Sequence, residues 1–258
     1  MPSKKPRFSF GFELLLCVLV VLLFNVVYFW EHLLFYIADI TERSVFADVL
    51  DIVIKAAVFG IVIIAGLKIQ KKTLSSVCFF KKASPAVWGS VVVFSTGFVL
   101  FYYYITFLFY SFFLGWDTDF ETPEGSLLVN IIETALIPAV AEELLFKGLI
   151  VSSLEKHHSR ITAIVITSLL FAASHLSIVR FVPLFLFSCC TFWIYYRTGS
   201  ILLPMLIHFM NNLFTMVLVS EPFASVGTFF SALVLCGAGF LLLRRISGDE
   251  RMKKGALS

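Results

Sequence analysis

The chain has 258 residues, of which 59% are hydrophobic and 14% are charged, and its mean hydropathy is +0.95. A soluble protein has roughly 45–50% apolar and about 25% charged residues, so this composition excludes a soluble globular protein and predicts an all-α, polytopic membrane protein. The net charge of +3 does not indicate a nucleic-acid partner, because the basic residues lie between apolar stretches rather than on one face.

Apolar stretches long enough to cross about 30 Å of hydrocarbon predict about eight spans in a single integral-membrane domain, residues 1–258. The boundary between the fifth and sixth spans is the least defined, because the gap between them is short. The approximate bounds are 10–30, 49–67, 87–115, 127–151, 161–179, 181–197, 200–219 and 225–243.

The lysines and arginines between these spans are distributed unevenly. Sixteen of them fall in tails and loops on one predicted side of the membrane, and only Arg43 and Arg180 fall on the other. Basic residues are concentrated in cytoplasmic loops of membrane proteins. The sequence therefore predicts that both termini are cytoplasmic.

The second predicted span contributes one pair of charged residues. Asp51 and Lys55 are four residues apart near its start, a spacing that places them on one helix face. We expect a structural ion pair there. Glu133 lies about one turn inside the fourth span from the outer face, and we expect it to be solvated.

The fourth predicted span carries further ionisable residues, each costing about 2.5–3.5 kcal/mol at the centre of a membrane helix. Glu143 and Lys147 have the i, i+4 spacing of an ion pair. Glu142 is turned about 100° away and has no obvious partner on its own helix, which makes it a candidate general base. Pro138, four residues earlier, should loosen the helix. A structural ion pair with a spare carboxylate is the alternative.

Two histidines lie within later spans, His175 in the fifth and His208 in the seventh. If the loop between spans four and five is centred near His157, Glu142 and His175 differ in depth by roughly 5 Å, so an antiparallel helix pair would bring them together. Asn212 and Asn211 lie four and three residues after His208, so either amide could share its face.

Carboxylates, imidazoles and an amide from three helices supply a base, a second proton carrier and donors for an oxyanion. Hydrolysis by an activated water is the reaction class that fits these groups best. A proton-coupled transporter is a weaker alternative, because these polar residues are confined to the second half of the chain, whereas transporters often show internal repeats.

The three motifs resemble those of the CAAX protease and bacteriocin-processing (CPBP, or Abi) family, which includes the type II CAAX prenyl endopeptidases. The family pattern is EExxxR, FxxxH and HxxxN on successive membrane helices. The corresponding residues here are Glu142, Glu143 and Lys147, then Phe171 and His175, then His208 and Asn212. The resemblance covers a motif-bearing core of about residues 127–219.

The resemblance implies an intramembrane endopeptidase in which Glu142 and His175 activate the attacking water. His208 and Asn212 would stabilise the oxyanion, and Glu143 would help to hold the site, with Lys147 and Phe171 in supporting positions. No cofactor is expected. Glu142, His175 and His208 are also suitable ligands for a divalent metal, which would make the chain metalloprotease-like.

The implied partners are membrane lipids and a membrane-associated peptide or protein, either prenylated or a bacteriocin precursor, with no nucleic acid. The expected location is the bacterial cytoplasmic membrane, with a eukaryotic internal membrane as the alternative, and the active-site cavity is expected towards the cytoplasm. Lys147 stands where the family has arginine; lysine can neutralise Glu143 but cannot grip a carboxylate bidentately. The alternative is therefore a non-catalytic scaffold or bacteriocin-immunity protein that keeps the protease fold.

Overall fold

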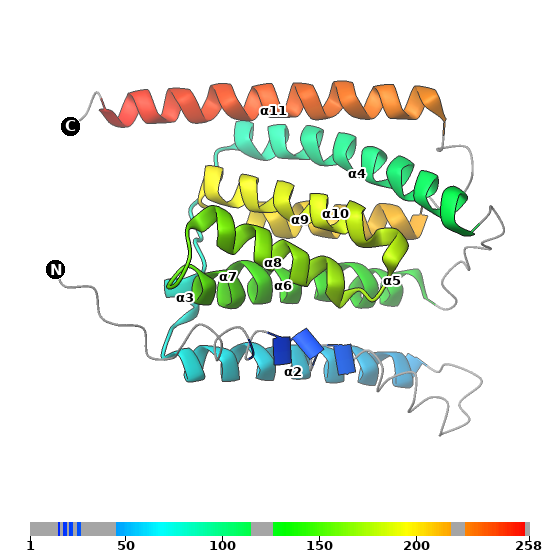
Figure 1. Ribbon diagram of the computed structural model, residues 1–258, viewed down its shortest axis with the longest axis vertical. Helices are drawn as coiled ribbons and strands as arrows, with labels where there is room; N and C mark the ends of the chain where they lie inside the picture. Colours follow the sequence, from blue (N-terminus) through cyan, green and yellow to red (C-terminus); the bar gives the residue numbers. More distant parts are fainter. Residues whose placement is uncertain are drawn as a thin grey trace. The chain divides into compact units, whose positions relative to one another are not determined.

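The described part of the chain is mainly helical (Figure 1). The computed structural model describes residues 45–114, 126–217 and 225–255, with Leu15, Val18, Leu19, Val21, Leu22, Asn25 and Val26. Within these ranges the only β-feature is an isolated bridge between Phe80 and Ser200. The all-α prediction is confirmed. The helices are α2 (Val45–Gln70), α3 (Leu74–Val77), α4 (Pro85–Leu114), α5 (Leu127–Asn130), η1 (Ile131–Leu136), α6 (Ile137–Glu143), η2 (Leu144–Ile150), α7 (Val151–Leu154), α8 (Arg160–Ser174), α9 (Ile178–Thr198), α10 (Leu202–Val217) and α11 (Val226–Gly255).

Four of the described helices contain segments long and apolar enough to cross a membrane: Asp48–Gln70, Pro85–Phe113, Ile178–Thr198 and Val226–Arg245. Helices α8 and α10 are shorter and also apolar. The predicted fourth span coincides with an unbroken helical stretch, residues 127–154, which runs from α5 to α7 and is called the site helix below. Most of the predicted first span lies outside the described residues, so the number of spans and the cytoplasmic termini remain predictions.

Contacts divide the chain into two compact units. The first unit comprises Met1–Cys78 and Gly125–Leu176, and the second comprises Phe79–Glu124 and Ser177–Ser258. In the first unit, α2 runs alongside the site helix, and α8 contacts both η2 and α7 (Figure 1). The motifs are therefore divided between units, with Glu142, Lys147 and His175 in the first and His208 and Asn212 in the second.

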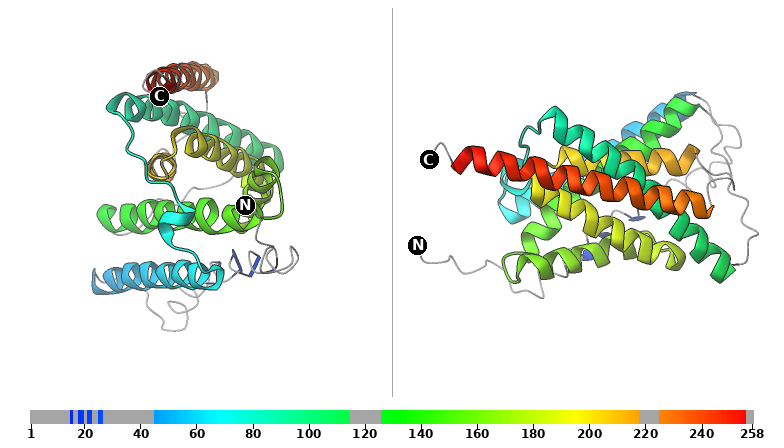
Figure 2. Two further views of the ribbon diagram at one scale, coloured as in Figure 1. Left: turned by 90° about the vertical axis from the view of Figure 1, so that its left-hand side faces the viewer. Right: turned by 90° about the horizontal axis from the view of Figure 1, so that it is seen from above.

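In the second unit, α11 lies directly along α4 (Figure 2). Two glycines allow this close approach. A Cβ atom on Gly97 would lie 2.5 Å from the backbone nitrogen of Cys236, and one on Gly239 would lie 2.5 Å from the backbone nitrogen of Phe94. Close backbone contact at small residues stabilises helix pairs in membranes, where apolar side chains gain little by leaving lipid.

The break between α8 and α9 differs from the sequence prediction. Helix α8 ends at Ser174 rather than near residue 179, and α9 begins at Ile178. Leu176 takes a left-handed conformation (φ 50°), and the Ser177 hydroxyl accepts a hydrogen bond from the Arg180 backbone N–H at 3.3 Å, which caps α9. As a result, His175 occupies the C-cap of α8 rather than its interior.

The glycine contact between α4 and α11 makes a testable prediction. Gly239→Ala places a methyl group against the immovable backbone of Phe94, so it should lower the free energy of unfolding by about 1–3 kcal/mol, measured by thermal unfolding in detergent. Gly237→Ala on the same helix is the matched control, because a Cβ there meets no atom within 4 Å. Equal stability of the two variants would contradict this packing.

Candidate active site

The site helix changes its hydrogen-bond pattern on both sides of the paired glutamates. The segments η1 and η2 are π-helical and flank α6, which ends at Glu143. The Ile137 N–H donates to the Ile132 carbonyl and the Val151 N–H to the Phe146 carbonyl, each five residues back. Pro138 has no N–H and would crowd the carbonyl four residues before it, which accounts for the wider turn of η1. The predicted loosening at Pro138 is therefore observed, and π-helical turns are frequent at functional sites.

Side chains at and just beyond the end of α2 bind carbonyl groups within and just after η2. Gln70 donates from Nε2 to the Leu149 carbonyl at 3.3 Å. Lys72 donates from Nζ to the Ser152 carbonyl at 3.0 Å and to its hydroxyl at 2.9 Å. These donors satisfy backbone oxygens at and just beyond η2. Helix α2 thus stabilises the irregular backbone that follows the two glutamates.

Glu143 and Lys147 form the ion pair that their spacing predicts. Lys147 Nζ lies 2.6 Å from Glu143 Oε2, and each side chain is only 1% exposed. Both charges are therefore removed from solvent and lipid and face each other on one helix. Lys147 therefore neutralises the Glu143 carboxylate.

Cys78, which follows α3, packs against Gly148, the residue after Lys147. A Cβ atom on Gly148 would lie 2.8 Å from Cys78 Sγ, so the glycine leaves room for the thiol. Burial, with a smaller contribution from the Glu143 carboxylate, raises the pKa of the Cys78 thiol to about 12. Cys78 is therefore a neutral thiol at physiological pH and has no thiolate character for nucleophilic attack.

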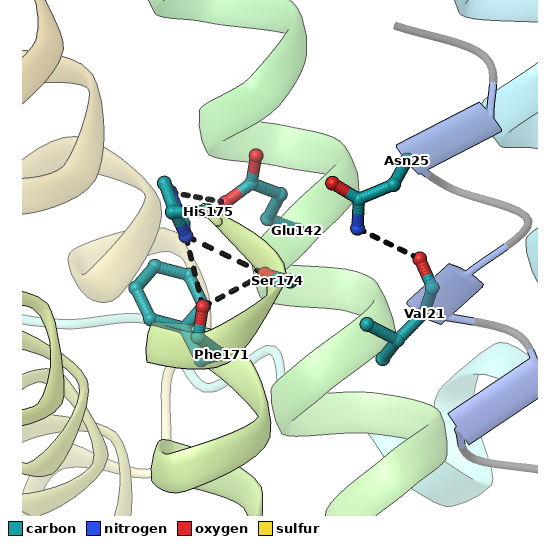
Figure 3. A network of polar contacts seen from close by, with 6 residues as sticks. All are labelled: Val21, Asn25, Glu142, Phe171, Ser174 and His175. Atoms are coloured by element: carbon teal, nitrogen blue, oxygen red, sulfur yellow. Dashed lines mark hydrogen bonds and ion pairs between the residues drawn. The ribbon is translucent and has the colours of Figure 1, made fainter. Parts of the chain in front are cut away.

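Glu142 faces His175 across the first unit, as the depth estimate predicts. His175 Nε2 lies 3.9 Å from Glu142 Oε2, and the Glu142 side chain is 8% exposed (Figure 3). The other ring nitrogen, Nδ1, lies 2.8 Å from the Phe171 carbonyl oxygen. Because a carbonyl only accepts, Nδ1 carries the proton, and the lone pair of the neutral ring is on Nε2, facing Glu142.

Two aromatic side chains form an apolar wall beside this pair. The Phe171 ring lies 4.9 Å from the His175 ring and 5.1 Å from the Phe146 ring. Both phenylalanines are almost fully buried. Phe171 thus contacts His175 twice, through its carbonyl group and through its ring.

The third motif lies on α10 in the second unit. His208 is 3% exposed, and its ring meets the Phe187 ring edge-on at 5.2 Å. Asn211 is also buried, whereas Asn212, which the family spacing favours, is partly exposed. Both asparagines follow His208 on α10 by about one turn, and their role as amide donors stays a prediction.

Two polar contacts in the first unit were not predicted from the sequence. Glu133 is 5% exposed rather than solvated, and it forms an ion pair with Lys55 of α2. Lys55 also lies 3.0 Å from Asp51, so the predicted pair on α2 exists but is shared with the site helix. In the N-terminal stretch, Asn25 donates from Nδ2 to the Val21 carbonyl at 2.9 Å (Figure 3). The sequence signal for the first contact was an acidic residue in span four opposite a lysine in span two.

The residues described by the structure do not form an evident metal site. Among them, no group of three His, Cys, Asp or Glu side chains is placed to hold a metal ion. Glu142 and His175 supply two ligands, whereas a catalytic zinc usually takes three from the protein. We therefore derive no step through a metal, and the expected absence of a cofactor remains a prediction.

The comparisons with known proteins gave one finding. Residues 124–214 match the family model described as type II CAAX prenyl endopeptidase Rce1-like. This range contains all three motifs. Neither the curated proteins nor the solved structures that were compared with the chain gave a match.

The buried Glu143–Lys147 pair predicts a large effect of removing one partner. Lys147→Met leaves a carboxylate in a site that is 1% exposed, so the free energy of unfolding should fall by about 3–5 kcal/mol. The double variant Glu143→Leu/Lys147→Met removes both charges and should recover most of this loss. Thermal unfolding in detergent measures both. A single variant as stable as the parent would show that the pair contributes nothing.

Proposed function

Because the chain belongs to the CAAX protease and bacteriocin-processing family, we propose that it is an intramembrane endopeptidase that hydrolyses a peptide bond through a water activated by Glu142 and His175. The observation that carries this proposal is the 3.9 Å approach of His175 Nε2 to Glu142 Oε2. A water at an ordinary hydrogen-bond distance of about 2.8 Å can contact both atoms at once. Two acceptors on one water leave its oxygen lone pairs directed away from them, towards a substrate.

In the proposed reaction, the Glu142 carboxylate takes a proton from the water while the water oxygen bonds to the peptide carbonyl carbon. His175 orients the water through Nε2, because its Nδ1 proton is held by the Phe171 carbonyl. The carbon–nitrogen bond then breaks, and the leaving amine receives the proton from Glu142. The products are a carboxylic acid and an amine, so no other reactant is needed.

The oxyanion that forms on the carbonyl oxygen needs hydrogen-bond donors. We assign this role to His208 and Asn212, on the basis of the family pattern and of the burial of His208 on α10. Donors held in a dry environment stabilise developing charge more strongly than donors in water. The buried ion pair of Glu143 and Lys147 is assigned a separate role. Its ammonium group neutralises Glu143, so that Glu142 has no second uncompensated negative charge beside it.

The proposed substrate is a membrane-associated protein or peptide, prenylated or a bacteriocin precursor, cleaved near the cytoplasmic face of a bacterial cytoplasmic membrane. A lipidated substrate fits an enzyme formed by apolar helices, because its acyl or prenyl chain can stay in the hydrocarbon while the peptide reaches the site.

The first test is cleavage of quenched fluorescent peptides, prenylated and unmodified, by the purified protein in detergent. Glu142→Gln keeps the size of the side chain but removes the base, so the rate should fall by about 10²–10⁴-fold without loss of folding. Glu155→Gln is the matched control, because this carboxylate lies beyond α7 in a partly exposed pair with Arg160 and should leave cleavage unchanged. Undiminished cleavage by a folded Glu142→Gln variant would refute the mechanism.

Lys147 favours a second candidate, a non-catalytic scaffold or immunity protein with the same fold. The Lys147 ammonium group presents a point charge to Glu143 and cannot bind a carboxylate bidentately as an arginine does. If the folded native protein cleaves no peptide and the Lys147→Arg variant does, the lysine has abolished the protease activity, and the non-catalytic candidate is supported. The close ion pair of Lys147 favours the endopeptidase, because the charge on Glu143 is already compensated.

A further inference from the structure

Lys55 on α2 is the centre of a buried polar contact between two helices of the first unit. Its ammonium group lies 3.0 Å from Asp51 on its own helix and forms an ion pair with Glu133 on the site helix. The side chains of Lys55, Asp51 and Glu133 are each less than 10% exposed. A lysine in the apolar part of a membrane helix is costly, so such residues are commonly functional.

Because Glu133 precedes Glu142 on the same helix, its ion pair with Lys55 can affect the position of the proposed base. Glu133 lies within η1, which is the irregular segment that precedes Glu142. If a π-helical turn reverts to α-helix, every following residue shifts by one position and turns by about 100°. Such a shift would move Glu142 out of line with His175 and turn a neighbouring residue towards it. The site therefore requires that the register of η1 be fixed.

Contacts with α2 and with Lys72, just beyond its end, fix the site helix on both sides of Glu142. Lys55 holds Glu133 before it, while Gln70 and Lys72 bind the carbonyls of Leu149 and Ser152 after it. Of these contacts, only the Lys55–Glu133 pair is an ion pair between buried side chains. It is also the one that falls on the π-helical turn preceding the base.

We propose that Lys55 is a positioning residue: by holding Glu133, it sets the register of η1 and thereby directs Glu142 towards His175. The role rests on the proposed endopeptidase function, but the register that Lys55 sets is a property of the fold. Loss of a pair that only stabilises the fold reduces the fraction of protein that is folded. Loss of a positioning pair also changes the geometry of the protein that does fold.

The first experiment compares cleavage kinetics of folded, purified variants. Lys55→Met keeps the length of the side chain without its charge, and kcat should fall at least tenfold while KM stays within about twofold. The charge-exchanged variant Lys55→Glu/Glu133→Lys should restore kcat to within about threefold of the parent. Lys68→Met is the matched control, since it makes the same change at an exposed lysine of the same helix and should keep at least half of the activity.

The second experiment reads the geometry without requiring cleavage. Glu142→Cys and His175→Cys are introduced into the full chain with its native cysteines replaced by alanine, and the rate of cross-linking by a short bismaleimide is measured. Lys55→Met should slow this reaction at least fivefold, and the charge exchange should restore it. If the native protein cleaves nothing, the endopeptidase proposal fails while cross-linking still decides the role of Lys55.

Two outcomes would overturn the role of Lys55. One is a folded Lys55→Met variant that cross-links like its parent. The other is a folded charge-exchanged variant whose kcat stays at least tenfold, and whose cross-linking rate stays at least fivefold, below that of the parent, a comparison that does not require Lys55→Met to fold. Restoration of cross-linking by the exchange supports the role.

Discussion

Charges on a membrane helix must be compensated, and this constraint accounts for much of the first unit. The site helix carries three buried carboxylates, each of which would be costly alone among apolar neighbours. Two of them are compensated by lysines, on another helix for Glu133 and on the same helix for Glu143, whereas Glu142 faces the imidazole of His175, which carries no charge in its neutral form. Only the imidazole can change its charge near neutral pH. The carboxylate opposite it is therefore the one suited to exchange protons, whereas the other two are fixed by permanent cations.

The two π-helical segments also lie within the site helix. The wider turn of η1 accommodates Pro138, and Gln70 and Lys72 donate to carbonyls within η2 and just beyond it. The irregular backbone is thus held by neighbouring side chains, as non-helical hydrogen bonding within a membrane requires.

The sequence predicted those features that depend on one helix or on hydropathy. The i, i+4 spacing was sufficient for the Glu143–Lys147 pair, and a count along two helices was sufficient for the approach of Glu142 to His175. The family was identified from three motifs, and the match over residues 124–214 confirms it.

Features that depend on two distant segments were missed or misplaced. Glu133 was predicted to be solvated, because nothing in the local sequence indicates that Lys55, 78 residues earlier, lies beside it. The sequence predicts an end of α8 near residue 179 rather than at Ser174, because apolar residues continue past Ser174 while the backbone turns at Leu176. Hydropathy reports the solvent around a segment, whereas the end of a helix is set by local backbone conformation and capping.

The shared position of Lys55 has a consequence for how the chain enters the membrane during synthesis. Helix α2 leaves the ribosome well before the site helix, and Lys55 can enter the bilayer already paired with Asp51 on its own helix. The site helix brings the Glu143–Lys147 pair with it, but Glu133 must find a cation that is already in place. Stable insertion of the later helix therefore depends on the earlier one, so the order of the two helices in the chain matches the order in which their charges can be neutralised.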